Sequence, residues 1–322
     1  MDNMMNKLEY INKKALENPN EFIEECEERY QKIISSIVER INSEKGREIV
    51  MLAGPSSAGK TTTARRIKKS LEESGVKTYV LSLDDFYLNR EDIPYLPDGS
   101  QDYETVYALD LQCLEKELNA LLRGERVKSP VFDFTTGKRS ETLFNEIVLG
   151  KDDVVIIEGL HALNPVITDK IQGNLLKVYI NVSSRIYDED GNIILNKRNL
   201  RFVRRMVRDY KYRDSTVENT CRLWKNVTKG EDEYLFPYRD NADIKANTIH
   251  FYEPCVLKHQ ALKMIEDSTV SDEYKEHILK LVNALKQFND IDEKIVPVNS
   301  LLREFLGEWL QIKHKGVTMN GR

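Results

Sequence analysis

The strongest constraint on the fold is a phosphate-binding pattern, G-x-x-x-x-G-K-[ST], which residues 54–61 fit with the sequence GPSSAGKT. Before this loop, residues 48–53 form a short apolar run rich in β-branched residues, which predicts a buried strand. After it, apolar residues recur every three or four positions from Thr61 to Ser74, which predicts a helix. A strand, a loop of small residues and a helix in this order direct backbone N–H groups at phosphate oxygens. The sequence therefore predicts a phosphate-binding loop in an α/β protein.

The last two residues of the loop carry chemistry beyond that of the backbone. The Lys60 ammonium can reach the β- and γ-phosphates of a nucleotide, and the Thr61 hydroxyl can bind Mg²⁺. We therefore assign the loop to the phosphates of a nucleotide cofactor, through Gly54, Ser56, Ser57, Ala58, Gly59, Lys60, Thr61 and Thr62.

Three further apolar runs predict the rest of a sheet. Residues 78–83 are followed by a pair of aspartates that begins with Asp84, residues 153–157 are followed by Glu158, and residues 175–182 form another run. Carboxylates at the carboxyl ends of parallel strands face the ligand crevice of an open α/β sheet. P-loop enzymes also hold Mg²⁺ or its water shell with an acid that closes a buried strand, which makes Glu158 a metal candidate. Since strands and helices alternate, we expect a doubly wound parallel sheet.

Arginine residues crowd the stretch that follows the last of these strands. Those at positions 201, 204, 205 and 208 fall on one face of a predicted helix. Like charges packed in this way repel one another unless an anion joins them, so the stretch is either a solvated helix face or a lid that closes on phosphates. Because the same chain carries a phosphate-binding loop, we favour an arginine lid at about residues 198–240.

Helical segments flank the central domain on both sides. Asn18 and Pro19 predict the start of a long helix, and we interpret its apolar stripe as a surface that packs on the central domain. We therefore divide the chain into a helical N-terminal extension at residues 1–46, a central domain at residues 47–265 and a helical C-terminal extension at residues 266–322.

Composition argues against several classes of partner. The net charge of −5 gives no global basic field for nucleic acid or an anionic membrane. The four cysteines are widely separated and no histidine lies at metal-ligand spacing, which argues against a cysteine metal site. The sequence has no apolar run of membrane-spanning length and no secretion signal, so we expect a cytoplasmic protein with a small-molecule substrate. A homo-oligomer stays open.

Five motifs occur in an order that matches a known family. They are GPSSAGKTT at 54–62, LSLDDFY at 81–87, PVFDF at 130–134, IIEGLHAL at 156–163, and the arginine helix that continues to ADI at 242–244. In this order they resemble the uridine kinase and phosphoribulokinase family, and the resemblance covers roughly residues 47–265. The motifs LWKNV at 223–227 and SLLREFLG at 300–307 are similar to a bacterial nucleoside kinase branch of the family. The resemblance implies a P-loop kinase fold and transfer of the γ-phosphate of ATP, with Mg²⁺, to a sugar hydroxyl.

The resemblance also implies roles for individual residues. Asp84 matches the aspartate that acts as general base on the acceptor hydroxyl, and Glu104 lies where the family binds ribose hydroxyls. Glu158 matches the acid near the magnesium ion, for which Thr61 is the second ligand. Catalysis is thus assigned to Asp84, Lys60 and Arg204, and substrate binding to Asp84, Tyr87, Glu104, Phe132, Phe134, Arg201 and Arg213.

The chain departs from the family pattern where the base would bind. Uridine kinases have tyrosine where this chain has Phe132 and histidine where it has Gly137, and those groups hydrogen-bond the pyrimidine. We therefore expect the base to stack on aromatic rings, with room beside Gly137 for a larger ring, and broad nucleoside acceptance or a preference other than strict pyrimidine. The alternative is that Thr135, Thr136 or His161 restores pyrimidine recognition.

The sequence thus predicts an ATP- and Mg²⁺-dependent kinase of a nucleoside 5′-hydroxyl. A second kinase interpretation keeps the fold and changes the acceptor to another sugar or small alcohol. A regulatory NTPase, with water as the acceptor, is less favoured. An inactive nucleotide sensor would require a damaged site, whereas Lys60, Thr61, Asp84 and Glu158 are all present.

Overall fold

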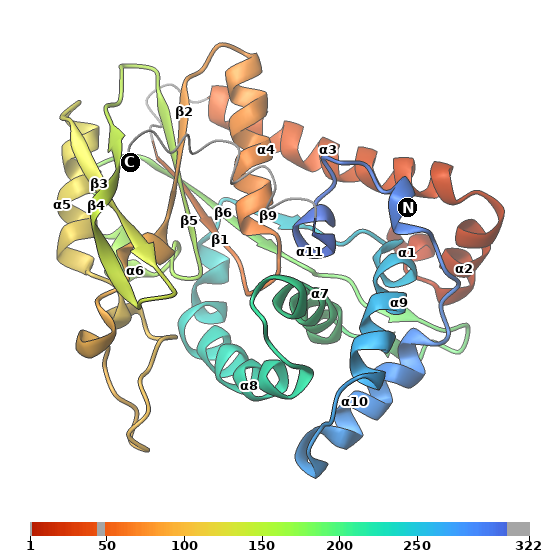
Figure 1. Cartoon of the computed structure of the whole chain (residues 1–322). Coiled ribbons are helices and arrows are strands. Elements are labelled where there is room, and N and C mark those ends of the chain that lie inside the picture. The colour runs from red at the N-terminus through yellow and green to blue at the C-terminus, as the bar shows by residue number, and fades with distance from the viewer. Residues whose placement is uncertain (1, 44–48, 308–322) are drawn as a thin grey trace, which may run out of the picture.

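The computed structural model describes residues 2–43 and 49–307, and its centre is a five-stranded parallel sheet (Figure 1). The strand order is β2-β5-β1-β6-β9, and every neighbouring pair is parallel. The phosphate-binding loop therefore follows the central strand of the sheet. The strands are β1 (Ile49–Ala53), β2 (Thr78–Ser82), β5 (Val154–Gly159), β6 (Leu175–Asn181) and β9 (Ile244–Asn247).

Both faces of the sheet are covered, because alternate residues of β1 point into two different hydrophobic clusters. Val50 and Leu52 belong to one cluster, and Ile49 and Met51 belong to the other. Figure 1 shows the corresponding helices on opposite sides of the sheet. This arrangement confirms the predicted doubly wound α/β fold. The first cluster includes α3 (Pro19–Ser43), α4 (Lys60–Glu73), α7 (Lys197–Tyr212) and α9 (Glu253–Glu266), and the second includes α5 (Leu111–Leu122) and α6 (Pro165–Thr168).

Two antiparallel hairpins and one long helix complete the central domain. The hairpins are β3 (Val127–Asp133) with β4 (Lys138–Ile147), and β7 (Ile186–Tyr187) with β8 (Ile193–Leu195). The helix is α8 (Val217–Tyr234), which follows α7 in the chain. The sequence did not predict β4, because most of its side chains are exposed and no apolar alternation marks it as a strand.

The N-terminal extension consists of α1 (Asp2–Met5), α2 (Leu8–Glu17) and α3, and it packs on the central domain. The Tyr30 hydroxyl on α3 is buried and lies 2.7 Å from the Thr63 hydroxyl on α4. The apolar stripe of the predicted helix thus covers the core, as expected. No helix in the described part of the chain, the 25-residue α3 included, is long and apolar enough to cross a membrane.

The C-terminal extension is helical in two separate stretches of the described residues. It contains α10 (Asp272–Leu285) and the single turn α11 (Arg303–Leu306). Between them, residues 286–302 form turns and a short 3₁₀ helix at Glu293–Ile295, because polar turn residues and Pro297 interrupt the helical pattern. Residues 308–322 lie outside the described residues.

Candidate active site

The phosphate-binding loop connects β1 to α4, and two of its glycines allow its path. A Cβ atom on Gly54 would lie 2.6 Å from the carbonyl oxygen of Ile180, so no larger residue fits there without a shift. Gly59 has a φ of 88°, in the left-handed region that glycine adopts without strain. Lys60 begins α4, and its ammonium donates to the Pro55 carbonyl at 3.3 Å. The loop thus brings a lysine and the positive end of a helix dipole to one place.

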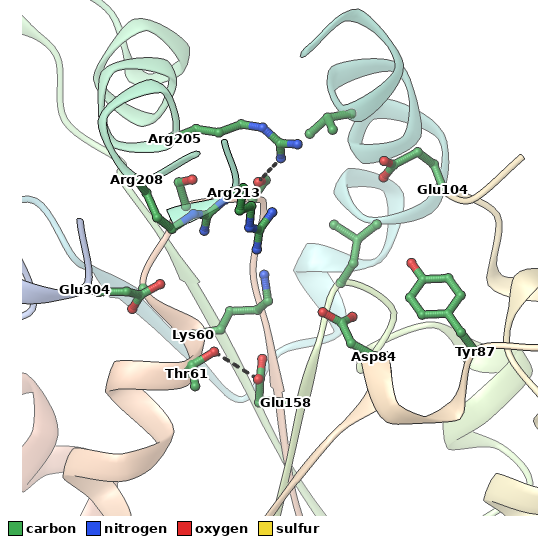
Figure 2. Close-up of a pocket in the computed structure, with 15 residues that line it drawn as sticks. Lys60, Thr61, Asp84, Tyr87, Glu104, Glu158, Arg205, Arg208, Arg213 and Glu304 are labelled. Carbon is green, nitrogen blue, oxygen red and sulfur yellow. Dashed lines mark hydrogen bonds between the residues drawn. The ribbon is translucent and has the colours of Figure 1, made fainter. Parts of the chain in front are cut away.

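A cavity of about 210 Å³ opens at this loop, beside the ends of β2 and β5 (Figure 2). Segments far apart in the sequence contribute to it, because the carboxyl ends of parallel strands meet at one edge of the sheet. Among the loop residues, Gly54, Ala58 and Thr62 do not line the cavity. The predicted site residues that the structure brings together in it are Ser56, Ser57, Gly59, Lys60, Thr61, Asp84, Tyr87, Glu104, Glu158 and Arg213.

Thr61 and Glu158 bring two side-chain oxygen atoms close together in the cavity. The Thr61 hydroxyl donates to Glu158 Oε1 at 3.0 Å, and the carboxyl group is buried at the end of β5. Burial raises the pKa of Glu158 to about 7, although the nearby Lys60 ammonium opposes the rise. Mg²⁺ in phosphate-transferring sites is bound by one or two such oxygens together with substrate phosphates and water. Thr61 and Glu158 therefore fit the ion when phosphates and water complete its ligands. Among the described residues, no group of three or more His, Cys, Asp or Glu side chains could hold a metal ion without them.

Asp84 and Asp85 follow β2 but have different surroundings. Asp84 is exposed and lines the cavity, and its backbone N–H donates to Ser82 Oγ at 3.3 Å. Asp85 Oδ1 instead accepts a hydrogen bond from the backbone N–H of Phe132 at 3.2 Å, which ties the strand end to the β3–β4 hairpin. Only Asp84 thus presents its carboxylate to a ligand in the cavity.

Glu104 lines the cavity on the same side as Asp84 and Tyr87, where α8 covers it (Figure 2). A Cβ atom on Gly230 of α8 would lie 2.5 Å from the Glu104 Cβ atom, so the glycine allows this close approach. Burial raises the pKa of Glu104 to about 7, and the Arg205 guanidinium opposes the rise. The carboxyl group can therefore donate or accept a hydrogen bond near neutral pH, as the hydroxyl groups of a sugar require.

Three arginines line the cavity and share one buried carboxylate. Asp209 lies 3.1 Å from Arg205, 2.9 Å from Arg208 and 3.5 Å from Arg213. Arg205 also donates to the Ser56 hydroxyl in the phosphate-binding loop at 2.7 Å. Three guanidinium groups around one carboxylate leave an excess of positive charge next to the loop. Such an excess in a partly buried site is stabilised by a bound anion, so this geometry suits phosphate.

Arg201 and Arg204 lie elsewhere, in contrast to the prediction that they contact the substrate and the transferring phosphate. Arg201 is buried and donates to both carboxylate oxygens of Glu231, at 2.7 and 2.8 Å, and Arg204 is buried and paired with Glu253. Each also donates to a backbone carbonyl of the phosphate-binding loop. Arg201 donates to the Ser56 carbonyl at 2.9 Å, and Arg204 donates to the Ser57 carbonyl at 3.2 Å. These two arginines therefore support the loop from behind and do not line the cavity.

The predicted aromatic residues form one cluster, of which only Tyr87 lines the cavity. The Phe132 ring centroid lies 5.8 Å from that of Tyr87 and 5.0 Å from that of Phe134. Phe132 is nearly buried, whereas 62% of Phe134 is exposed. The room expected beside Gly137 is taken by Arg90, whose Nε would lie 2.8 Å from an added Cβ atom. Of these three rings, that of Tyr87 thus lines the cavity, and Phe132 packs against it.

Three charged residues of the cavity, Arg205, Arg208 and Glu304, were not predicted as site residues from the sequence. Arg205 and Arg208 lie in the arginine stretch, but nothing in the helical spacing separates them from the buried Arg201 and Arg204. Arg201 and Arg204 differ from them in having glutamate partners, which lie 30 and 49 residues downstream in the chain. Only the fold brings these glutamates close. Glu304 comes from α11, far from the phosphate-binding loop in the chain.

Comparisons with known proteins identify the family of this chain. Residues 49–251 match the model of the phosphoribulokinase / uridine kinase family. A uridine kinase from Staphylococcus haemolyticus (strain JCSC1435) is 30% identical over 198 residues, which are 61% of this chain and 85% of that protein. A uridine kinase from Macrococcus caseolyticus (strain JCSC5402) is 29% identical over 198 residues, with the same shares of 61% and 85%.

A solved structure described as a possible uridine kinase from Bacillus stearothermophilus is 20% identical, covers 67% of this chain and 98% of its own, and has a TM-score of 0.45. The family match alone extends over more than half of the chain and includes the phosphate-binding loop, Asp84, Glu158 and the arginines of α7. The chain belongs to the phosphoribulokinase / uridine kinase family of P-loop kinases.

Proposed function

We propose that this chain transfers the γ-phosphoryl group of ATP to the 5′-hydroxyl group of a nucleoside. The observation that carries the proposal is the position of the Asp84 carboxylate, in the same cavity as Lys60 and three arginines. A base for an alcohol and a set of cations for phosphates thus face the same space. Membership of the family supports the ATP-dependent kinase activity, and the nucleoside acceptor rests on the 30% identical uridine kinase.

The phosphoryl donor would bind between the phosphate-binding loop and α7. Phosphoryl transfer requires positioning and neutralisation of charge more than covalent chemistry by the protein. Lys60 and the cavity arginines Arg205, Arg208 and Arg213 supply positive charge for this purpose. Thr61 and Glu158 would hold Mg²⁺, which neutralises charge on the phosphate oxygens.

The acceptor would bind on the Asp84 side of the cavity. Asp84 accepts the proton of the 5′-hydroxyl group as that oxygen forms a bond to the γ-phosphorus, and the bond to the leaving ADP breaks. Glu104 binds the ribose hydroxyl groups, because a pKa of about 7 lets its carboxyl group donate or accept a hydrogen bond near neutral pH. Tyr87 offers a ring on which the base can stack.

The experiment that tests the proposal measures ADP formation from Mg²⁺-ATP with a panel of nucleosides, sugars and small alcohols. We expect one or more nucleosides to raise ADP formation above the background without acceptor and to yield the nucleoside 5′-monophosphate. Lys60→Ala is the control, and loss of this donor lowers turnover by about 10²–10³-fold. If only another sugar or alcohol stimulates, the acceptor is wrong, and if none does while ATP is hydrolysed, the chain is an NTPase.

The preference for the base is a second readout of the same experiment. A site built to hydrogen-bond a substrate group rejects analogues that lack it by about 10⁴-fold, whereas an apolar slot discriminates only about 10–200-fold. Tyr87 and Phe132 supply ring surface, so we expect modest differences in kcat/KM among uridine, cytidine, adenosine, guanosine and inosine. A preference for uridine and cytidine of more than about a thousandfold over every purine would contradict stacking as the main contact.

A further inference from the structure

The C-terminal turn α11 brings a carboxylate into the cavity from outside the region that matches the family. Glu304 lines the same cavity as Lys60, and its Oε2 accepts a hydrogen bond from the Thr62 hydroxyl at 2.5 Å. Figure 2 shows Glu304 beside Thr61 and below Arg208. The matched region ends at residue 251, so this carboxylate belongs to the C-terminal extension. The extension is therefore part of the wall of the proposed nucleotide site.

The turn is held by the phosphate-binding loop on one side and by α7 on the other. The Leu301 side chain covers Gly59 so closely that a Cβ atom there would lie 2.5 Å from Leu301 Cδ1. From α7, Lys211 donates to the Leu306 carbonyl at 2.9 Å, and the Arg204 guanidinium lies 5.3 Å from the centre of the Phe305 ring. A movement of α11 would therefore change its contacts with the phosphate-binding loop and with α7.

The charge of Glu304 opposes the ligand that the rest of the cavity suits. Its carboxylate accepts the hydrogen bond that the Thr62 hydroxyl group donates. Thr62 lies in the first turn of α4, and the dipole of this helix attracts phosphate to that end. The Glu304 carboxylate also raises the pKa of Glu158, although burial and the Asp84 carboxylate have larger effects. A nucleotide phosphate near Thr62 would face a like charge at this point, which costs binding free energy.

We propose that Glu304 competes with the phosphates of the nucleotide for the phosphate-binding loop, so that α11 shifts away when the nucleotide binds. The proposal rests on the proposed function, because it requires a nucleotide in this cavity. It assigns to the C-terminal extension the role of lowering the affinity for nucleotide until α11 is displaced. The contacts of α11 with Lys211 and Arg204 connect that displacement to α7.

The test compares dissociation constants for Mg²⁺-ADP and Mg²⁺-ATP, measured by calorimetry on the full chain without an acceptor. Glu304→Gln keeps the shape and the acceptor oxygen but removes the charge, and we expect nucleotide to bind about tenfold more tightly. Glu304→Ala should bind at least as tightly as Glu304→Gln. Glu266→Gln, an exposed residue on α9 outside the cavity, is the matched control and should leave the dissociation constants unchanged. Unchanged or weaker binding in both Glu304 variants would overturn the proposal.

Hydrogen exchange gives an independent readout in the unmodified protein. If the nucleotide displaces α11, the amides of residues 303–307 should exchange faster when ADP is added, whereas a ligand that only packs against α11 would slow them. The two proposals fail separately. A protein that binds no nucleotide would refute the proposed function, whereas normal nucleotide binding that does not respond to the loss of the Glu304 charge would refute this inference alone.

Discussion

Five arginines in and just after α7 form two sets that differ in burial and in partners, although Arg204 and Arg205 are adjacent in the chain. Arg204 is fully buried and pairs with one glutamate, as Arg201 does. Arg205 lines the cavity and shares Asp209 with Arg208 and Arg213. The buried set is neutralised one to one by protein carboxylates, whereas the cavity set is not.

This difference separates a structural charge from a functional one. A buried charge without a partner is unstable, so each buried arginine requires its glutamate for folding. The three guanidinium groups of the cavity set share the carboxylate of Asp209 in their ion pairs, an arrangement that a bound anion would stabilise. The first set therefore holds the phosphate-binding loop in place, and we propose that the second binds the phosphate.

The largest effect is expected for stability when a buried pair is broken. Arg204→Ala leaves Glu253 buried and uncompensated, which costs about 3–5 kcal/mol in the free energy of unfolding. Urea denaturation followed by circular dichroism measures this loss. Changing Arg204 to Met together with Glu253 to Leu should lose less than the single variant, because no charge is left unpaired. A loss below about 1 kcal/mol in Arg204→Ala would mean that the pair is not structural.

The next effect concerns turnover and should appear in the cavity set. Arg205→Ala removes one of the proposed donors to the transferring phosphate, so we expect kcat to fall by about 10²–10³-fold while stability changes little. Arg205→Lys keeps the positive charge but cannot donate two parallel hydrogen bonds as a guanidinium group does. It should therefore recover part of the lost turnover. The measurement is steady-state ADP release with a saturating acceptor. If Arg205→Ala lost stability and kept its turnover, the two sets would be assigned the wrong way round.

A smaller effect is expected from pH. The pKa of Glu104 is raised to about 7 by burial, so the folded protein holds a proton that the unfolded chain releases at lower pH. The free energy of unfolding should therefore fall as the pH rises from about 5 to about 7, by about 1–3 kcal/mol more than in Glu104→Gln. Denaturation at several pH values, without nucleotide, gives both slopes. Identical slopes would show that Glu104 is ionised throughout this range.

The smallest effect is expected for an exposed arginine of the same helix. Arg198 pairs with Asp232 on the surface, where about half of each side chain is exposed, at 45% and 55%. Exposed pairs contribute little, so Arg198→Ala should change stability and turnover by less than about 0.5 kcal/mol each. The same denaturation and turnover assays apply. A large effect on turnover would extend the functional set to the start of α7.

Much of the fold follows from local sequence patterns, and the failures have a common cause. The strand before the phosphate-binding loop, the helix after it and the acids at the ends of β2 and β5 were predicted from apolar runs and the motif alone. The division of the α7 arginines was not, because Glu231 and Glu253 reach them only through tertiary packing. Glu304 was missed for the same reason, since no local pattern connects it with Thr62.

Asp84 tests most directly whether this cavity transfers phosphate to an alcohol. Asp84→Asn keeps the shape of the side chain but removes the base, so turnover should fall by about 10²–10⁴-fold. The dissociation constant for Mg²⁺-ADP, measured on the same variant, should stay within about threefold of that of the parent. Loss of both turnover and nucleotide binding, or of neither, would contradict the role of Asp84 as the base on the acceptor hydroxyl.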